Sequence, residues 1–176
     1  MSKIPPRYES AIFDDVPEEI KQAYSNLNER GIYIHGSVGT GKTHIAYALL
    51  KKTRADGRSA MFWNTTEMMR DIRRDLDRDS YDKTHTDSFL MDFKGVLFLD
   101  DIGSEKMTDW VAETFYLIIN RRYNYILPTV FTSNFSIAEL ADRIGDRTVS
   151  RIVEMCKVIP LNGDDRRLSK IINKNK

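Results

Sequence analysis

Residues 36–43 read Gly36-Ser37-Val38-Gly39-Thr40-Gly41-Lys42-Thr43 and match the pattern G-x-x-x-x-G-K-[ST]. The apolar run before this stretch, at residues 31–35, predicts a buried strand, and the residues from Thr43 to Arg54 predict a helix. Glycines between a strand and a helix expose backbone N–H groups to an anion, and the helix N-terminus adds partial positive charge. The stretch therefore predicts a phosphate-binding loop, in which Lys42 reaches the β- and γ-phosphates and the Thr43 hydroxyl binds Mg²⁺.

This loop makes ATP and Mg²⁺ the expected cofactors. The residues expected to bind them are those of the loop, the helical residue that follows it, and an aspartate described below: Gly36, Ser37, Val38, Gly39, Thr40, Gly41, Lys42, Thr43, His44 and Asp100.

The composition is that of an ordinary globular protein. The chain has 176 residues, of which 41% are hydrophobic and 30% are charged, and its formal net charge is +1. A charge so close to zero gives no global attraction to nucleic acid, so any such site must be a local patch. The one cysteine, Cys156, excludes an intrachain disulfide and a cysteine-based zinc cluster. With no signal peptide and no long apolar run, the sequence predicts a cytoplasmic protein with no membrane partner.

Expected strands alternate with expected helices along the chain. The strands are expected at 31–35, 59–63, 96–99, 129–133 and 158–161. The helices are expected at 18–28, 43–54, 64–76, 110–122, 136–142, 146–155 and 166–173. This order predicts an α/β fold, in which helices cover both faces of a mostly parallel five-stranded sheet in a three-layer α/β/α sandwich. Pro160 indicates an edge position for the last strand.

The chain is expected to form one domain. Residues 1–30 are expected to supply a lead-in and a helix, the lead-in being extended up to Pro17, and residues 31–176 to supply the core. Residues 89–93 are expected to lead into the third strand. Little chain follows Asn134, so a full separate lid domain is not expected.

Polar residues follow two of the expected strands. Asp100 and Asp101 end the apolar run 96–99, and Asn134 ends the strand 129–133. Asp100 is in a position to hold Mg²⁺ beside Thr43. Asp101 can polarise the attacking water as a general base, and the Asn134 amide can both donate and accept a hydrogen bond between that water and the γ-phosphate. Solvated acids at a strand end and an asparagine in a turn are the structural alternatives.

Two pairs of arginines lie near the C-terminus. Arg147 and Arg151 are four residues apart and share one face of the expected helix. An arginine from a neighbouring subunit can stabilise the transferring phosphoryl group, typically by about 10³–10⁵ in rate. Arg166 and Arg167 follow Gly163-Asp164-Asp165, from where an arginine can reach the γ-phosphate of its own subunit. A solvated helix face and a basic tail are the respective alternatives.

Taken together, these motifs resemble those of AAA+ ATPases of the DnaC/IstB group, the bacterial and phage replicative-helicase loaders. The matching segments are Ile4-Pro5-Pro6-Arg7-Tyr8, the phosphate loop, Leu97-Phe98-Leu99-Asp100-Asp101-Ile102-Gly103, Thr132-Ser133-Asn134, Asp146-Arg147-Thr148-Val149-Ser150-Arg151 and Gly163-Asp164-Asp165-Arg166-Arg167. The resemblance implies a P-loop NTPase fold of the AAA+ type. It also implies that Asn134 is the sensor 1 residue, Arg151 the arginine finger with Arg147 as a companion, and Arg167 the sensor 2 residue.

The resemblance further implies a path for single-stranded DNA along the segment 66–92. Its candidate phosphate contacts are Arg70, Arg73, Arg74 and Lys83. Acidic residues are as frequent as basic ones between residues 70 and 83, so a mixed solvated face is the alternative. Group members usually carry an additional N-terminal domain that grips the helicase. This chain starts at the lead-in to the nucleotide site. We therefore expect either an isolated ATPase domain or a naturally short form.

The expected function is therefore ATP hydrolysis by a DnaC-like helicase loader that acts in DNA replication. The expected partners are single-stranded DNA, a replicative helicase of the DnaB type, and further copies of the chain in a head-to-tail multimer, within a bacterial or phage-infected cell. Three alternatives remain: an IstB-like transposition helper, a nucleotide-gated adaptor that hydrolyses little ATP, and a small-molecule kinase that uses the same loop. Asp101 stands where many related ATPases have glutamate. Because aspartate is shorter, the sequence does not exclude an adaptor that binds ATP and hydrolyses little of it.

Overall fold

The computed structural model describes residues 3–76 and 86–163, in which every pair of successive strands is separated by one or two helices. The strands are β1 (Gly31–His35), β2 (Ala60–Asn64), β3 (Val96–Asp100), β4 (Thr129–Ser133) and β5 (Cys156–Pro160). The helices are α1 (Glu18–Ser25), α2 (Lys42–Ala55), α3 (Thr65–Leu76), α4 (Thr86–Asp92), α5 (Asp109–Asn124), α6 (Ile137–Ile144) and α7 (Asp146–Met155). Within these described ranges, no helix is both long and apolar enough to span a membrane.

The five strands form one parallel sheet in the order β2-β3-β4-β1-β5. The carboxyl ends of β3, β4 and β1 are therefore neighbours at the same edge of the sheet. β5 pairs only with β1 among the described strands, so the edge position that Pro160 indicated is confirmed.

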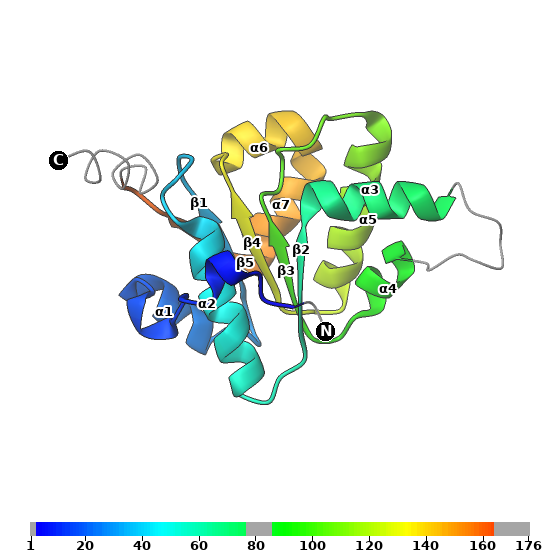
Figure 1. Ribbon diagram of the computed structural model, residues 1–176. Helices are drawn as coiled ribbons and strands as arrows, with labels where there is room; N and C mark the ends of the chain where they lie inside the picture. Colours follow the sequence, from blue (N-terminus) through cyan, green and yellow to red (C-terminus); the bar gives the residue numbers. More distant parts are fainter. Residues whose placement is uncertain (1–2, 77–85, 164–176) are drawn as a thin grey trace.

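Helices cover both faces of the sheet, which confirms the three-layer α/β/α arrangement (Figure 1). The core on one face packs α1 and α2 against the sheet through residues such as Ile20, Leu49 and Phe98. The core on the other face packs α3 to α7 against it through residues such as Met68, Phe115 and Ile152. Because β3 and β4 lie inside the sheet and are covered by helices on both faces, they are buried at every position, whereas the edge strand β5 has exposed positions.

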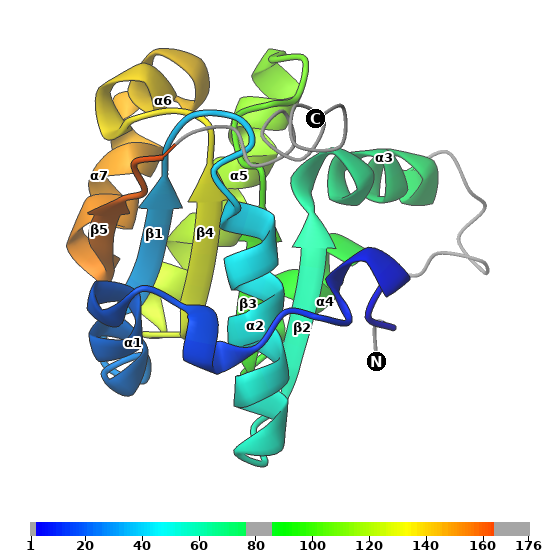
Figure 2. The same cartoon turned by 60° about the vertical axis from the view of Figure 1, so that its left-hand side comes forward.

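The lead-in is not wholly extended, which corrects the expectation for residues 1–17. It forms two single-turn 3₁₀ helices, η1 (Pro6–Tyr8) and η2 (Phe13–Asp15). Proline lacks the N–H that a first turn leaves unpaired, so Pro6 begins a turn instead of preventing one. The lead-in crosses the outer side of α2 (Figure 2), where the Tyr8 ring stacks on Tyr47 with centroids 4.3 Å apart.

The segment that was expected to lead directly into the third strand forms helix α4. Its start is anchored to the end of α3 by the buried Asp75, whose carboxylate accepts hydrogen bonds from the Thr86 backbone N–H at 3.0 Å and from the Thr86 hydroxyl at 2.6 Å. This contact joins residues that are eleven positions apart. A local hydrophobic pattern cannot reveal such a contact.

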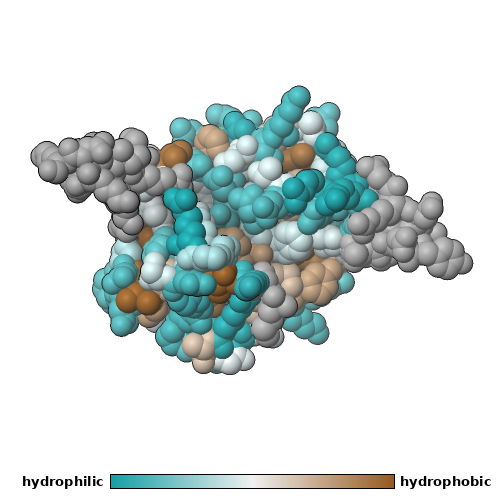
Figure 3. All heavy atoms as spheres, viewed as in Figure 1, coloured by the Kyte–Doolittle hydropathy of each residue, from teal (hydrophilic) through white to brown (hydrophobic). Residues whose placement is uncertain are grey.

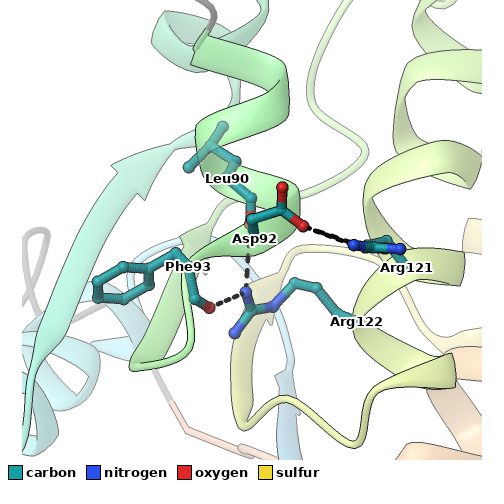
Figure 4. A network of polar contacts seen from close by, with 5 residues as sticks. All are labelled: Leu90, Asp92, Phe93, Arg121 and Arg122. Carbon is teal, nitrogen blue, oxygen red and sulfur yellow. Dashed lines mark hydrogen bonds and ion pairs between the residues drawn. The ribbon is translucent and has the colours of Figure 1, made fainter.

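A fully buried arginine on α5 joins α4, β3 and β4 at the end of the sheet away from the phosphate loop. The Arg122 side chain is 0% exposed and donates to the carbonyls of Leu90, Phe93, Gly95 and Pro128 and to the Thr129 hydroxyl at 2.8–3.2 Å. Figure 4 shows two of these bonds, beside the exposed pair of Arg121 and Asp92. Burial lowers the pKa of Arg122 to about 10.

Candidate nucleotide-binding site

The candidate site lies where β1, β4 and β3 end side by side. The phosphate loop connects β1 to α2 above this edge of the sheet (Figure 2). Asp100 and Asp101 follow β3, and Asn134 follows β4, which lies between the other two strands. The fold therefore brings together all three groups of polar residues that the sequence placed at strand ends.

The loop adopts a conformation that depends on its glycines. Gly39 and Gly41 have φ values of 85° and 100°, in the left-handed region that side chains disfavour. At Gly36, a Cβ atom would lie 2.2 Å from the carbonyl oxygen of Leu161. Inside the loop, the Lys42 ammonium donates to the carbonyls of Gly36 and Ser37, both at 2.7 Å.

Asp100 is held by two threonines from neighbouring elements. One carboxylate oxygen accepts from the Thr132 hydroxyl of β4 at 2.6 Å, and the other from the Thr43 hydroxyl of α2 at 3.2 Å. Asp100 is only 5% exposed. Burial raises the pKa of this carboxyl above its ordinary value, while the hydrogen bonds from Thr132 and Thr43 lower it.

This arrangement fits a magnesium ion. Mg²⁺ prefers hard oxygen ligands and is usually held by one or two carboxylates together with substrate phosphates. The Asp100 carboxylate and the Thr43 hydroxyl are such oxygens, and they already lie in contact beside the loop. A cation bound beside a buried carboxylate also offsets the cost of burying its charge.

Asp101 and Asn134 form a second polar pair. The Asn134 amide donates to the Asp101 carboxylate at 2.7 Å, and the Asp101 backbone N–H donates to the Thr132 hydroxyl at 2.9 Å. Asp101 has a φ of 65°, a conformation that costs energy for a residue with a side chain. The pair of contacts holds Asp101 in this conformation, which aims its carboxylate at Asn134 rather than along the strand.

Sequence reasoning missed two polar residues that support this site. The Thr132 hydroxyl contacts both Asp100 and Asp101, although a threonine in a strand looks like an ordinary core residue. Glu105 is 5% exposed and accepts from the Gly103 backbone N–H at 3.0 Å. Burial raises the pKa of the Glu105 carboxyl above its ordinary value. In the sequence, the only sign that Glu105 belongs near the site is that it follows Asp100 and Asp101 by a few positions.

The two arginines of α7 lie together, as their spacing predicted, but apart from the loop. Arg151 contacts Asn120 and Tyr116 of α5, and Arg147 contacts Tyr116 as well. In residues 3–76 and 86–163, the hydrogen bonds of both guanidiniums go to α5 and to α7 itself, and none goes to the phosphate loop.

The candidate DNA contacts on α3 carry nearby acidic partners. Arg70 and Arg74 both lie near Asp71, at 3.5 and 3.6 Å, and the Arg73 guanidinium lies 4.9 Å from the centre of the Trp110 ring. The surface over α3 is hydrophilic in the view of Figure 3. Lys83, Arg166, Arg167 and the helix expected at 166–173 lie outside the described residues.

The sheet order, the glycine loop and the acid at the end of β3 define a P-loop nucleotide-binding domain of the AAA+ class. The family of IstB-like ATP-binding proteins matches residues 22–173. This chain therefore belongs to that ATP-binding family, as its motifs predicted.

Its relatives include helicase loaders and an insertion-sequence protein. The replicative helicase loader DnaI of Bacillus subtilis is 29% identical over 170 residues, which cover 89% of this chain and 54% of the relative. A putative ATP-binding protein of insertion sequence IS5376 from Geobacillus stearothermophilus is 26% identical over 145 residues, which cover 80% of this chain and 56% of that protein. The chain thus spans about half the length of these relatives.

A solved structure supports the same assignment. The crystal structure of a DnaC helicase loader superimposes with a TM-score of 0.78 at 29% sequence identity. The match covers 90% of this chain and 100% of that one. This chain is thus similar to the DnaC and DnaI helicase loaders as well as to the IstB-like ATPases.

Proposed function

We propose that this chain is the ATP-hydrolysing domain of a DnaC-like helicase loader. It would bind Mg-ATP and assemble head to tail on single-stranded DNA with a replicative helicase of the DnaB type. The observation that carries the proposal is the polar cluster in which Thr43 and Thr132 hold Asp100 while Asn134 holds Asp101. A nucleotide-binding loop alone does not require the second pair, whereas the hydrolysis of a phosphoanhydride needs an oriented water.

Each residue of the cluster receives a role from its position. Lys42 would leave the loop carbonyls and donate to the β- and γ-phosphates when ATP binds. Thr43 and Asp100 would hold a magnesium ion, whose charge would neutralise part of the phosphate charge. Asp101 accepts a proton from the attacking water, and Asn134 orients that water against the γ-phosphate. His44 and the loop glycines complete the nucleotide-binding set, and Arg167 is proposed as the sensor 2 residue.

The head-to-tail arrangement follows from the arginines of α7. Because the contacts of Arg147 and Arg151 in the described residues are with α5 and α7, we propose that they serve the ATP site of a neighbouring copy. Arg151 is the proposed finger and Arg147 its companion. An interface that joins two different surfaces in this way produces rings or open spirals, and a spiral can follow a DNA strand.

The test is phosphate release measured with and without oligo-dT, combined with sizing in a non-hydrolysable ATP analogue. We expect DNA to stimulate hydrolysis, and we expect growth from monomer to multimer only when both ligands are present. Asn134→Ala is expected to lower turnover by about 10²-fold, because an unoriented water loses catalytic positioning. It should leave ATP affinity unchanged. A near-zero rate under all conditions would instead favour the nucleotide-gated adaptor.

A transposition helper is the second candidate, since the IS5376 relative is a putative ATP-binding protein of an insertion sequence. Both candidates use the same ATP site and differ in the client protein. Stimulation of ATP turnover by a replicative helicase would support the loader. Stimulation by a transposase alone would support the helper. A monomer whose turnover needs a small phosphate acceptor, and is indifferent to Arg151→Ala, would indicate a kinase.

A further inference from the structure

One tyrosine on α5 contacts both arginines of α7. The Arg147 and Arg151 guanidinium carbons lie 5.1 and 5.0 Å from the centre of the Tyr116 ring. The Tyr116 hydroxyl accepts from Arg147 Nη2 at 3.3 Å and from Arg151 Nη2 at 3.5 Å. The ring face and the hydroxyl of Tyr116 therefore both contact the two guanidiniums, which holds the two arginine side chains next to each other.

Arg151 is held more firmly than Arg147. Its Nε donates to the Asn120 side-chain oxygen at 2.8 Å, and its Nη1 donates to the Arg147 backbone carbonyl at 2.7 Å. With the Tyr116 contact, all three nitrogens of the guanidinium are engaged. A side chain fixed in this way before a ligand arrives loses less rotamer entropy when the ligand binds.

The partners of the two arginines are electrically neutral. In the described part of the chain, none of the ion pairs includes Arg147 or Arg151. Two positive charges thus lie against the Tyr116 ring, and within the described residues neither forms an ion pair with a carboxylate. Arg151 also lies 5.8 Å from the centre of the Tyr123 ring. A guanidinium has five N–H donors, and the three contacts of Arg151 leave two for an incoming group. A pair of anionic oxygens, such as those of a phosphate, matches this requirement.

We propose that Tyr116 and Asn120 are positioning residues that present Arg147 and Arg151 to the ATP phosphates of a neighbouring copy. This inference rests on the proposed function, because it assumes that the arginines act in trans. Tyr116 and Asn120 do not touch the nucleotide themselves. Their contribution is to hold Arg151 in one rotamer with two N–H groups that its three hydrogen bonds do not use. Assembly of two copies can then complete the ATP site without reordering this side chain.

The test compares DNA-stimulated ATP turnover in variants of the full chain. Tyr116→Ala and Asn120→Ala are expected to lower kcat by about 10–100-fold, since small misplacements of a catalytic group have effects of this size. The KM for ATP and the melting temperature should stay near the wild-type values. Tyr116→Phe keeps the ring but loses the hydroxyl, so its kcat should fall less than that of Tyr116→Ala.

Two residues at the C-terminal end of α5, its last residue Asn124 and its C-cap Tyr125, supply matched controls. Tyr125 stacks with Arg121 at 4.0 Å, and the exposed Asn124 ends the helix. Tyr125→Ala and Asn124→Ala remove the same kinds of side chain and should leave kcat unchanged. A further comparison uses a background that lacks both arginines, where Tyr116→Ala should have no additional effect on turnover.

The outcomes separate this inference from the proposed function. Wild-type turnover in the background without the two arginines would overturn the proposed function and, with it, this inference. Low turnover in that background, together with wild-type kcat for Tyr116→Ala and Asn120→Ala, would overturn the inference alone. An equal loss of turnover from Tyr116→Ala in both backgrounds would also overturn it, because the tyrosine would then act through the fold and not through the arginines.

Discussion

Replacing Arg122 by methionine should destabilise the protein severely. Methionine keeps the length and much of the apolar stem but removes five hydrogen bonds, four of them to backbone carbonyls. At about 1 kcal/mol for each bond, the loss is about 5 kcal/mol. The variant also no longer carries the desolvation cost of a buried charge, which offsets part of the lost stability. We therefore expect the free energy of unfolding to fall by about 3–5 kcal/mol, out of the roughly 5–15 kcal/mol typical of a domain.

Urea denaturation measures this change. With a slope m of about 2 kcal/mol/M, the midpoint should fall by about 2 M while m is unchanged. The neighbouring Arg121→Met is the matched control, because Arg121 pairs with Asp92 where both side chains are largely exposed, at 42% and 66%. Exposed pairs contribute about 0–1 kcal/mol, so the control should remain close to the wild type. Equal midpoints for the two variants would refute the reasoning that the buried network holds α4, β3 and β4 together.

Three further predictions concern the site and its surroundings. Thr132→Val removes the hydroxyl that contacts Asp100. Because hydrogen bonds to charged groups contribute about 1.5–3 kcal/mol, affinity for Mg-ATP, measured by titration calorimetry, should fall by about 10- to 150-fold. Affinity for metal-free ATP should not change. Because the folded-state pKa of Glu105 is raised above its ordinary 4.5 by burial, the native state binds more protons, and stability falls as pH rises from 4.5 through the folded pKa. The melting temperature of Glu105→Gln should therefore decline less between pH 5 and pH 7.5 than that of the wild type, and an equal decline would contradict this. Changing Arg70, Arg73 and Arg74 together to alanine should reduce the slope of log affinity for oligo-dT against log salt concentration by about 2, because each phosphate contact on a single strand contributes about 0.7. The affinities are measured by fluorescence anisotropy. An unchanged slope would show that α3 does not contact the DNA.

The sequence was sufficient to predict features that depend on local patterns. The phosphate loop, the strand ends at Asp100 and Asn134 and the edge position of Pro160 each depend on residue types at short spacing, and parallel strands bring their carboxyl ends together. The helix expected at 136–142 likewise depends on a local pattern, because Ser136 and Glu139 form a capping box at the start of α6.

Features that depend on contacts across the fold could not be predicted. In the sequence, Arg122 is only the last residue of an expected amphipathic helix. Its buried role could not be predicted, because its hydrogen-bond partners lie 6 to 32 positions away along the chain. Asp75 fixes the start of α4 across a segment whose hydrophobic pattern is weak. The Tyr116 contacts with α7 join residues more than 30 positions apart. Such roles become visible only when the packing of the helices is known.

A mixing experiment tests the central claim, that each ATP site is completed by an arginine from a second copy. Lys42→Ala removes the lysine of the phosphate loop, and Arg151→Ala removes the proposed finger, so each variant alone should hydrolyse ATP poorly in the presence of oligo-dT. In an equal mixture, a site that takes its loop from one variant and its arginine from the other is intact. Random head-to-tail assembly then predicts recovery to about a quarter of the wild-type rate. No recovery in the mixture, or wild-type turnover by Arg151→Ala alone, would contradict the claim.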